Sequence, residues 1–373
     1  MAYYLSHINS LRPLLVAHSQ GLVRLRLTQD AFDPEPPAGQ AWHDTLARLR
    51  QLGVRAPVHI QVNDRNQLRR LKTAHVHLSA LNQLPESFWK VDKSLYITSA
   101  NRCFVDEAAL RSLYSAIQLG FELCGTYSLD DTAARGFWDV RSSTTQASLA
   151  AFAAQCNGSP GAPTAGRAAQ FVMNGSASPR ETDVAMQLFL PPRLGGFGFP
   201  PALLNYPLPG FEGQFSNPYR RPTNLQRVNQ QPSNQPRTSQ GPSDRRRVNQ
   251  QPSNQRQANQ HLANLRTIPG EPAGYAPRCD FYWPEQRVAV EYDSDAEHTG
   301  SDRIHHDSVR RNRLTSGNIT VLTYTNDQFK SWQETQQFAI QLASLLKWNV
   351  RTSRFETTQH TIDLRKFLFG SEY

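Results

Sequence analysis

The residues best suited to catalysis are acidic side chains in three separate short stretches. Glu181 belongs to "SPRET", Asp280 opens "DFYWPE", and Glu291 and Asp293 lie in "VEYDSDAEH", which also contains His298. If this last stretch begins as a strand, Glu291 and Asp293 share one face and repel each other unless something binds them. Hard divalent ions such as Mg²⁺ prefer carboxylate oxygens, and a metal held by them would activate water and neutralise phosphate during phosphodiester cleavage.

Each acid also has an ordinary structural explanation. Ser178, Pro179 and Glu181 stand at the first positions of a predicted helix, where they form a capping-box pattern. Asp280 can simply begin a strand, and Glu291 and Asp293 can lie on a solvated strand face. The joint order of these acids along the chain therefore favours a metal site more than any one of them does alone.

The helices and strands that must position these acids are indicated by the spacing of apolar residues. Period-2 and period-3.6 patterns predict a helix over 176–190, strands over 278–283 and 286–293, a polar helix over 301–316, a strand over 319–325 and a long amphipathic helix over 327–348. Together these ranges predict a small α/β domain from 176–210 and 276–350, followed by an uninformative tail over 351–373. We expect Asp280, Glu291 and Asp293 to converge at one end of its sheet.

Residues 1–175 predict a separate mixed α/β domain. Its expected strands span 57–62, 74–79 and 94–99, and its expected helices span 41–52, 66–71, 105–127, 144–156 and 162–174. His75 and His77 alternate on the second of these strands, share a face and could bind a metal. An isolated pair rarely suffices without a third ligand, so the simpler interpretation is that they are ordinary strand residues.

Residues 211–275 have a different composition, rich in Asn, Gln, Pro, Ser and Arg, and contain "RVNQQPSNQ" twice. Almost nothing apolar is available to bury, which predicts a disordered insertion. Residues 220–278 hold ten arginines and no lysine against Asp244 and Glu271, a net charge of +8 within a chain total of +9. Such a segment attracts polyanions, most obviously nucleic acid, although a solubilising insert without a partner would look the same.

Several classes of protein are disfavoured by composition. No apolar run approaches the roughly 20 residues of a membrane span, and the first residues do not resemble a signal peptide, so a cytoplasmic protein is expected. The cysteines, Cys103, Cys124, Cys156 and Cys279, are widely spaced without a CxxC pair, which argues against a zinc or redox motif. Cys124 and Cys156 are interpreted as buried small residues within helices.

The combined pattern "DFYWPEQRVAVEYDSDAEH…D..RRNRL…G..VLTYT" resembles the PD-(D/E)xK endonuclease superfamily, and most of all its branch related to the very-short-patch-repair (Vsr) endonucleases. The resemblance covers about 176–205 and 276–348. It implies a restriction-endonuclease-like αβββαβ core, interrupted here by the basic insertion, and a Mg²⁺- or Mn²⁺-dependent endodeoxyribonuclease. Asp293 stands where the superfamily has lysine, and Ser294 stands where the branch usually has glycine.

The resemblance also assigns roles to individual residues. Glu181, Asp280 and Glu291 would bind the metal, Asp293 would be a further ligand or position water, and His298 would act as general base or contact phosphate. The expected DNA contacts are to the backbone, through Arg245, Arg246, Arg247, Arg310 and Arg311. The lysine replacement keeps an alternative open: a catalytically silent nuclease-like module that binds nucleic acid or a partner protein.

The N-terminal region resembles, more faintly, the non-DNA-binding part of AbiEi-type antitoxin-like proteins, through "VHLS…LP" (76–85) and "LYITSANRCFVDEA" (95–108). This likeness implies a setting in bacterial defence, a mobile element or a toxin–antitoxin system, by analogy alone. The oligomeric state is not predicted by any feature of the sequence.

Overall fold

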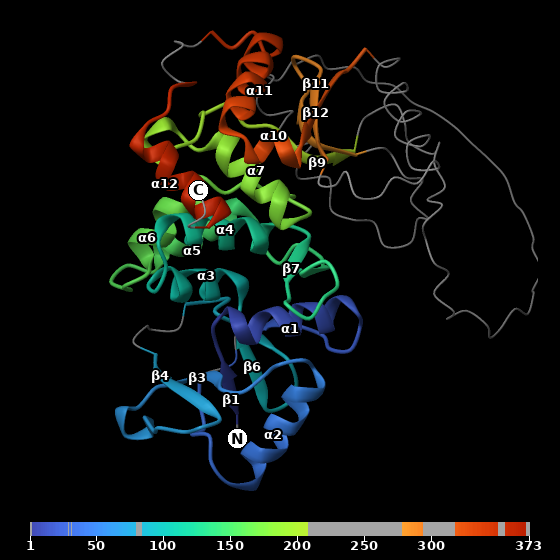
Figure 1. Cartoon of the computed structure of the whole chain (residues 1–373). Coiled ribbons are helices and arrows are strands. Elements are labelled where there is room, and N and C mark those ends of the chain that lie inside the picture. Colours follow the sequence, from blue (N-terminus) through green and yellow to red (C-terminus); the bar gives the residue numbers. More distant parts are fainter. Residues whose placement is uncertain are drawn as a thin grey trace, which may run out of the picture. The chain divides into compact units, whose positions relative to one another are not determined.

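The computed structural model describes residues 2–28, 30, 32–79, 84–207, 278–293, 318–349 and 355–370. The described residues belong to one compact unit. The predicted insertion over 211–275, the predicted helix over 301–316 and His298 lie outside the described residues. The described unit is mixed α/β, as the sequence predicts (Figure 1).

The N-terminal part is built on a six-stranded mixed sheet with the order β2-β5-β6-β1-β3-β4. Its strands are β1 (Tyr3–Leu5), β2 (Arg26–Thr28), β3 (Val58–Val62), β4 (Ala74–Leu78), β5 (Phe88–Lys90) and β6 (Leu95–Thr98). β1 pairs with β6 in parallel and with β3 in antiparallel orientation, and β3 pairs with β4 in parallel. The strands predicted over 57–62, 74–79 and 94–99 are confirmed as β3, β4 and β6.

Helices and a small hairpin complete this part of the chain. They are α1 (Ile8–Ser19), α2 (Gly39–Gln51), the 3₁₀ turn η1 (Arg65–Gln67), α3 (Ala100–Ala108), α4 (Leu113–Cys124), the strand pair β7 (Tyr127–Leu129) and β8 (Phe137–Asp139), α5 (Gln146–Gln155) and α6 (Ala162–Ala169). The short helix predicted over 66–71 is only the single turn η1. Cys103, Cys124, Cys156 and Cys279 are all buried.

The single helix predicted over 105–127 is wrong. The structure has two helices, α3 and α4, and the second begins where the Ser112 hydroxyl accepts a hydrogen bond from the backbone N–H of Ser115. A single helix over 105–127 would place Leu110 in one apolar stripe with Leu113, Ile117 and Phe121. In the structure Leu110 is instead 73% exposed, in the turn between the two helices. The Ser112 side chain caps the start of a new helix, which competes with continuation of α3 through this position. The cap therefore divides the helix although the apolar spacing continues through the turn.

The C-terminal part is built on a four-stranded sheet with the order β12-β11-β10-β9. Its elements are α7 (Pro179–Phe189), the 3₁₀ turn η2 (Pro192–Leu194), β9 (Leu203–Pro207), β10 (Arg278–Trp283), β11 (Val288–Asp293), β12 (Thr320–Thr325), α10 (Asn326–Lys330), α11 (Trp332–Leu345) and α12 (Gln359–Phe369). β9, β10 and β11 are antiparallel neighbours, whereas β12 runs parallel to β11.

The helix predicted over 327–348 is also divided. Ser331 ends α10 and caps α11 by accepting a hydrogen bond from the backbone N–H of Glu334. The C-terminal residues, expected only as a tail, contain α12. Arg365 of this helix is 1% exposed and donates hydrogen bonds to the carbonyl oxygens of Phe329 and Lys330, which belong to α10. These bonds satisfy carbonyls that the end of α10 leaves without helical partners.

α7 packs against α4 (Figure 1). Polar side chains hold it there and join it to β7. Gln118 of α4 donates a hydrogen bond of 3.0 Å to Asp183, and Tyr127 of β7 bonds the hydroxyl of Thr182 at 2.9 Å. Thr182 also bonds the buried hydroxyl of Ser176 at 2.8 Å. Because most of these partners are buried, breaking the hydrogen bonds would leave polar groups unsatisfied, so the bonds hold the start of α7 in position.

No helix in the described residues is long and apolar enough to cross a bilayer.

Two glycines near α6 give a matched test of this packing. A Cβ at Gly161 would collide with the backbone carbonyl oxygen of Val105 in α3, whereas a Cβ at Gly166 would enter open space. We expect Gly161→Ala to lower the free energy of unfolding by about 1–3 kcal/mol through overpacking. Gly166→Ala should raise it by about 0.5–1 kcal/mol because alanine favours a helix interior. Urea unfolding followed by circular dichroism measures both, and equal effects would contradict this packing.

Candidate functional site

Glu181 sits at the third position of α7, and its surroundings explain its placement. The hydroxyl of Ser178, the N-cap, accepts a hydrogen bond from the backbone N–H of Glu181, as the sequence predicts. Glu181 Oε1 in turn accepts a hydrogen bond of 3.2 Å from that hydroxyl. Its Oε2 accepts one of 2.9 Å from the backbone N–H of Ala177. The carboxylate thus reaches back one residue beyond the N-cap, a variant of the predicted capping box.

Asn205 of β9 joins this carboxylate from a distant part of the sequence. Its side-chain Nδ2 donates hydrogen bonds to Glu181 Oε2 at 2.6 Å and to the carbonyl oxygen of Gly175 at 3.0 Å. Asn205 has a φ of 47°, in the left-handed region that asparagine tolerates better than most residues. Sequence reasoning missed Asn205. An asparagine inside an apolar strand was a signal for the unusual backbone, but nothing in the spacing pointed to Glu181.

Asp280 and Glu291 are brought together by strand pairing. Phe281 pairs with Val290, so the next position in this antiparallel register sets Asp280 opposite Glu291. Asp280 Oδ2 accepts a hydrogen bond of 2.7 Å from the backbone N–H of Tyr292, one residue further along β11. On the other side of β10, the register sets Asp280 opposite Asn205. The neighbouring strand β12 supplies Thr323 beside Glu291.

The electrostatic state of Glu181 links α7 to the sheet. Burial, followed by repulsion from the Asp280 carboxylate, raises the pKa of Glu181 to about 7. The hydrogen bonds from Ala177, Asn205 and Ser178 act in the opposite direction by stabilising the ionised form. A carboxyl group with such a pKa lies near the protonation balance that suits general acid–base work or cation binding at neutral pH.

Of the remaining predicted site residues, Asp293 lies within the described residues, whereas the predicted histidine and arginines do not. Asp293 lies at the end of β11, is exposed, and pairs in register with Thr325 of β12. Glu291, two residues earlier on the same face of β11, is half-buried. The other predicted site residues lie outside the described residues: His298, Arg245, Arg246, Arg247, Arg310 and Arg311. The structure therefore places the Glu181–Asp280–Glu291 group, which we call the acidic cluster, without describing its predicted histidine and arginines.

The carboxylate oxygens of Glu181, Asp280 and Glu291 do not all lie within 4.8 Å of one another, the spacing at which three ligands can share one ion. Among the His, Cys, Asp and Glu side chains in the described ranges, a group of three with ligand atoms within 4.8 Å of one another occurs once, and it consists of histidines of the N-terminal part. Glu181 and Asp280 nonetheless lie close enough for their charges to interact. Oxygen ligands of this kind suit Mg²⁺ or Mn²⁺ better than softer metals.

Comparison of the chain with protein-family models, with curated proteins and with solved structures finds no match.

The raised pKa of Glu181 predicts a pH dependence of stability. In the presence of a chelator, the free energy of unfolding should fall as pH rises from about 4.5 to about 7. Unfolded Glu181 loses its proton near the lower value, whereas the folded carboxyl group keeps it until the higher one, so the folded state binds more protons across this window. Glu181→Gln, which does not titrate, should show a flatter profile.

Asp183 requires its own control, because burial also raises its pKa to about 7 and it contributes in the same direction. The quantity to compare is therefore the difference between wild type and Glu181→Gln, measured by urea unfolding at a series of pH values, with the same comparison made in an Asp183→Asn background. Parallel profiles for wild type and Glu181→Gln would show that Glu181 titrates in the folded protein as it does in the unfolded chain.

Proposed function

We propose that this protein is a metal-dependent endodeoxyribonuclease of the restriction-endonuclease-like fold. The observation that carries the proposal is the acidic cluster: Glu181 and Asp280, far apart in sequence, interact electrostatically, and strand register sets Glu291 beside Asp280. The order of elements supports it as well. A helix, three antiparallel strands and a fourth strand parallel to the third follow one another in α7, β9, β10, β11 and β12.

The residues of the acidic cluster fit a hard divalent ion by the chemistry of their donors. Glu181, Asp280 and Glu291 would hold Mg²⁺ or Mn²⁺, which when bound supplies an activated water and positive charge against the phosphodiester. The repulsion between Glu181 and Asp280 is a cost that a bound cation would remove. Asn205 would keep Glu181 oriented through its 2.6 Å hydrogen bond. Asp293 at the strand end would orient water, and His298 would act as general base or contact phosphate.

One observation favours a second candidate, a nuclease-like module that binds nucleic acid or a protein without cleaving it. Both oxygens of Glu181 already accept hydrogen bonds, from Ala177, Ser178 and Asn205. These bonds account for the residue as a helix-capping acceptor without any metal. Asp293, at the position where the superfamily has lysine, points in the same direction.

The cleavage proposal is tested by nicking of supercoiled plasmid DNA with Mg²⁺ or Mn²⁺. Asp280→Asn and Glu291→Gln should each lower the nicking rate by at least about 100-fold, because several kcal/mol of charge stabilisation are lost. Asp363→Asn is the matched control, since Asp363 is an exposed acid on α12. Thermal unfolding shows whether each variant is folded. Equal nicking by all four proteins would remove Asp280 and Glu291 from the mechanism. DNA binding without nicking by the folded wild type would favour the second candidate.

The partner in the proposal is the DNA backbone, contacted through the arginine-rich segment 220–278 with its charge of +8. Each neutralised phosphate contributes about 0.9 to the slope of log affinity against log salt concentration. Replacing Arg245, Arg246 and Arg247 with glutamine should therefore reduce that slope by roughly two to three units. Fluorescence anisotropy of a labelled duplex at several salt concentrations measures it. An unchanged slope would remove these three arginines from the DNA interface.

The biological setting belongs to the same proposal. A nuclease joined to an N-terminal region that resembles AbiEi-type antitoxin-like proteins would suit a bacterial defence or toxin–antitoxin system, in which cleavage is held in check until a trigger arrives. This part rests on the sequence resemblance alone.

A further inference from the structure

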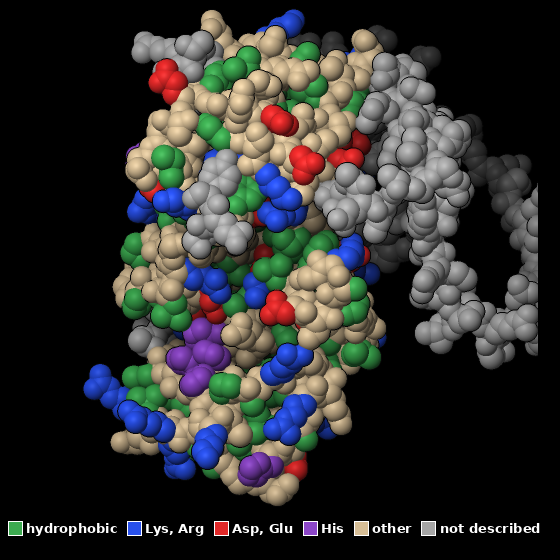
Figure 2. All heavy atoms as spheres, viewed as in Figure 1, with side chains coloured by type: hydrophobic (Ala, Val, Ile, Leu, Met, Phe, Trp, Pro, Cys, Tyr) green, Lys and Arg blue, Asp and Glu red, His purple; other side chains and the backbone are tan. Residues whose placement is uncertain are grey.

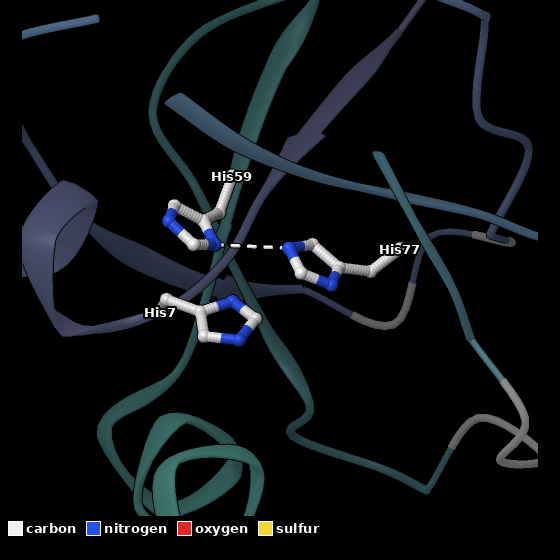
Figure 3. Close-up of side chains that lie close together, drawn as sticks. All are labelled: His7, His59 and His77. Carbon is white, nitrogen blue, oxygen red and sulfur yellow. Dashed lines mark hydrogen bonds between the residues drawn. The ribbon is translucent and has the colours of Figure 1, made fainter. Parts of the chain in front are cut away.

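Three histidines from separate elements of the N-terminal part meet at one point (Figure 3). His7 follows β1 and precedes α1, His59 lies on β3, and His77 lies on β4. Each offers one ring nitrogen, and these three atoms lie within 4.8 Å of one another. His59 Nδ1 and His77 Nε2 are 2.9 Å apart. We call this group the histidine cluster, and it is separate from the acidic cluster in both its residues and its ligand atoms.

Strand register explains why two of the three meet. β3 and β4 are parallel, and His59 pairs with His75 while Gln61 pairs with His77. Residues two apart on a strand share a face, so these four side chains project from the same side of the sheet. The sequence predicted His75 and His77 on one face but supplied no third ligand. The third and fourth histidines come from β3 and from the end of β1, which only the fold brings close.

His7 has an unusual backbone conformation. Its φ of 67° and ψ of 156° lie in a region occupied almost only by glycine, and the residue is 8% exposed. A non-glycine residue in this region costs free energy, and such residues concentrate at functional sites. The conformation lets the backbone of β1 turn into α1 while the imidazole of His7 stays with those of His59 and His77, at ring-centroid distances of 4.4 and 4.5 Å.

The imidazoles are in the neutral form that binds metals. Burial, followed by repulsion from neighbouring histidines, lowers the pKa of His7 and of His77 to about 4. A neutral imidazole has one nitrogen with a free electron pair, whereas a protonated one has none. The two nearby arginines are each paired with an acid, Arg102 with Asp106 and Arg111 with Glu107. An incoming cation would therefore meet surroundings without a net positive charge.

Two further side chains lie near the histidines: Ser6, which is hydrogen-bonded to His7, and Gln61, whose side-chain oxygen is placed to be a further ligand. Ser6 Oγ lies 2.8 Å from His7 Nδ1, which leaves Nε2 of His7 for a ligand. A hydrogen bond to the second ring nitrogen is the usual device that orients a metal-binding histidine. Gln61 is 4% exposed and donates from Nε2 to Asp106, and its buried Oε1 has no hydrogen-bond partner among the described residues. Gln61 pairs with His77 in the strand register, so this buried carbonyl oxygen is placed to serve as a further metal ligand.

We propose that His7, His59 and His77 form a binding site for a divalent transition-metal ion of the Zn²⁺ class. Two nitrogens at about 2.0–2.1 Å from a tetrahedral ion lie roughly 3.3 Å apart, so small rotations of these side chains would produce the required spacing. Water or Gln61 Oε1 would occupy the fourth position. Three nitrogen ligands with one open position is the count found in catalytic zinc sites, whereas structural sites are closed by four protein ligands.

The site is accessible to an ion from solution. His75 is exposed and its ring lies 5.1 Å from that of His59, while His59 and His77 are half-buried. Figure 2 shows histidine side chains gathered at one place on the surface of the N-terminal part. His75 is thus placed at the mouth of the site, where it can take part in exchanging the ion.

The test uses the full chain, stripped with a chelator and titrated with Zn²⁺ against a chromophoric competitor. The wild type should bind one equivalent at this site, and His59→Gln and His77→Gln should each weaken that binding by more than about 100-fold, beyond the usual effect of losing an outer partner. Ser6→Ala should weaken it by about 10- to 100-fold. His43→Gln, which removes an exposed histidine of α2, should bind like the wild type.

Two further measurements distinguish the histidine cluster from the acidic cluster and identify the atoms that bind the ion. Asp280→Asn should bind Zn²⁺ at this site like the wild type, which separates it from the acidic cluster. X-ray absorption of the Zn²⁺-loaded wild type should show imidazole ligands, a readout that does not depend on the folding of any variant. Absence of stoichiometric binding, an ion held by oxygen ligands alone, or unchanged affinity in folded His59→Gln and His77→Gln would each overturn the proposal.

Discussion

The C-terminal part depends on accommodating the carboxylate of Glu181 in buried surroundings, where it is repelled by the carboxylate of Asp280. Their repulsion is tolerated because each carboxylate accepts hydrogen bonds from groups that the fold fixes, the backbone N–H of Ala177 and the amide of Asn205 for one and the backbone N–H of Tyr292 for the other. Charge-assisted bonds of this kind are stronger than neutral ones. The beginning of α7, the irregular backbone of β9 and the antiparallel pairing of β10 with β11 all serve this arrangement.

The N-terminal part contributes to the same arrangement from a distance. α4 and β7 hold α7 through Gln118 and Tyr127, and α4 is itself tied to α1 by the two-pronged ion pair between Arg12 and Glu122, with both distances 2.7 Å. Planar guanidinium and carboxylate groups paired in this way fix orientation as well as distance. The six-stranded and four-stranded sheets are therefore connected through helices, and the start of α7, which carries Glu181, is held by residues far from the four-stranded sheet.

Local features were predictable from sequence because they depend on neighbours in the chain. The cap at Ser178, the strands that carry Asp280 and Glu291 and the strand that carries His77 all follow from spacing over a few residues. The turn between α3 and α4 was missed because an apolar period continued through it while a serine cap interrupted it. Asn205, His7 and His59 were missed for a different reason. Their roles depend on pairings between strands that are far apart in the sequence, and the spacing of residues within one short stretch does not reveal such pairings.

The burial of all four thiols has a practical consequence. Cys103 and Cys124 lie in α3 and α4, Cys156, which the sequence places within a helix, directly follows the end of α5, and Cys279 lies in β10. Each is at most 1% exposed. Burial also raises the pKa of the first three thiols, so the reactive thiolate is scarce in the folded protein. Modification by a thiol reagent therefore requires the chain to open locally. The four thiols are native reporters of local opening around the N-terminal helices and at β10, without any introduced label.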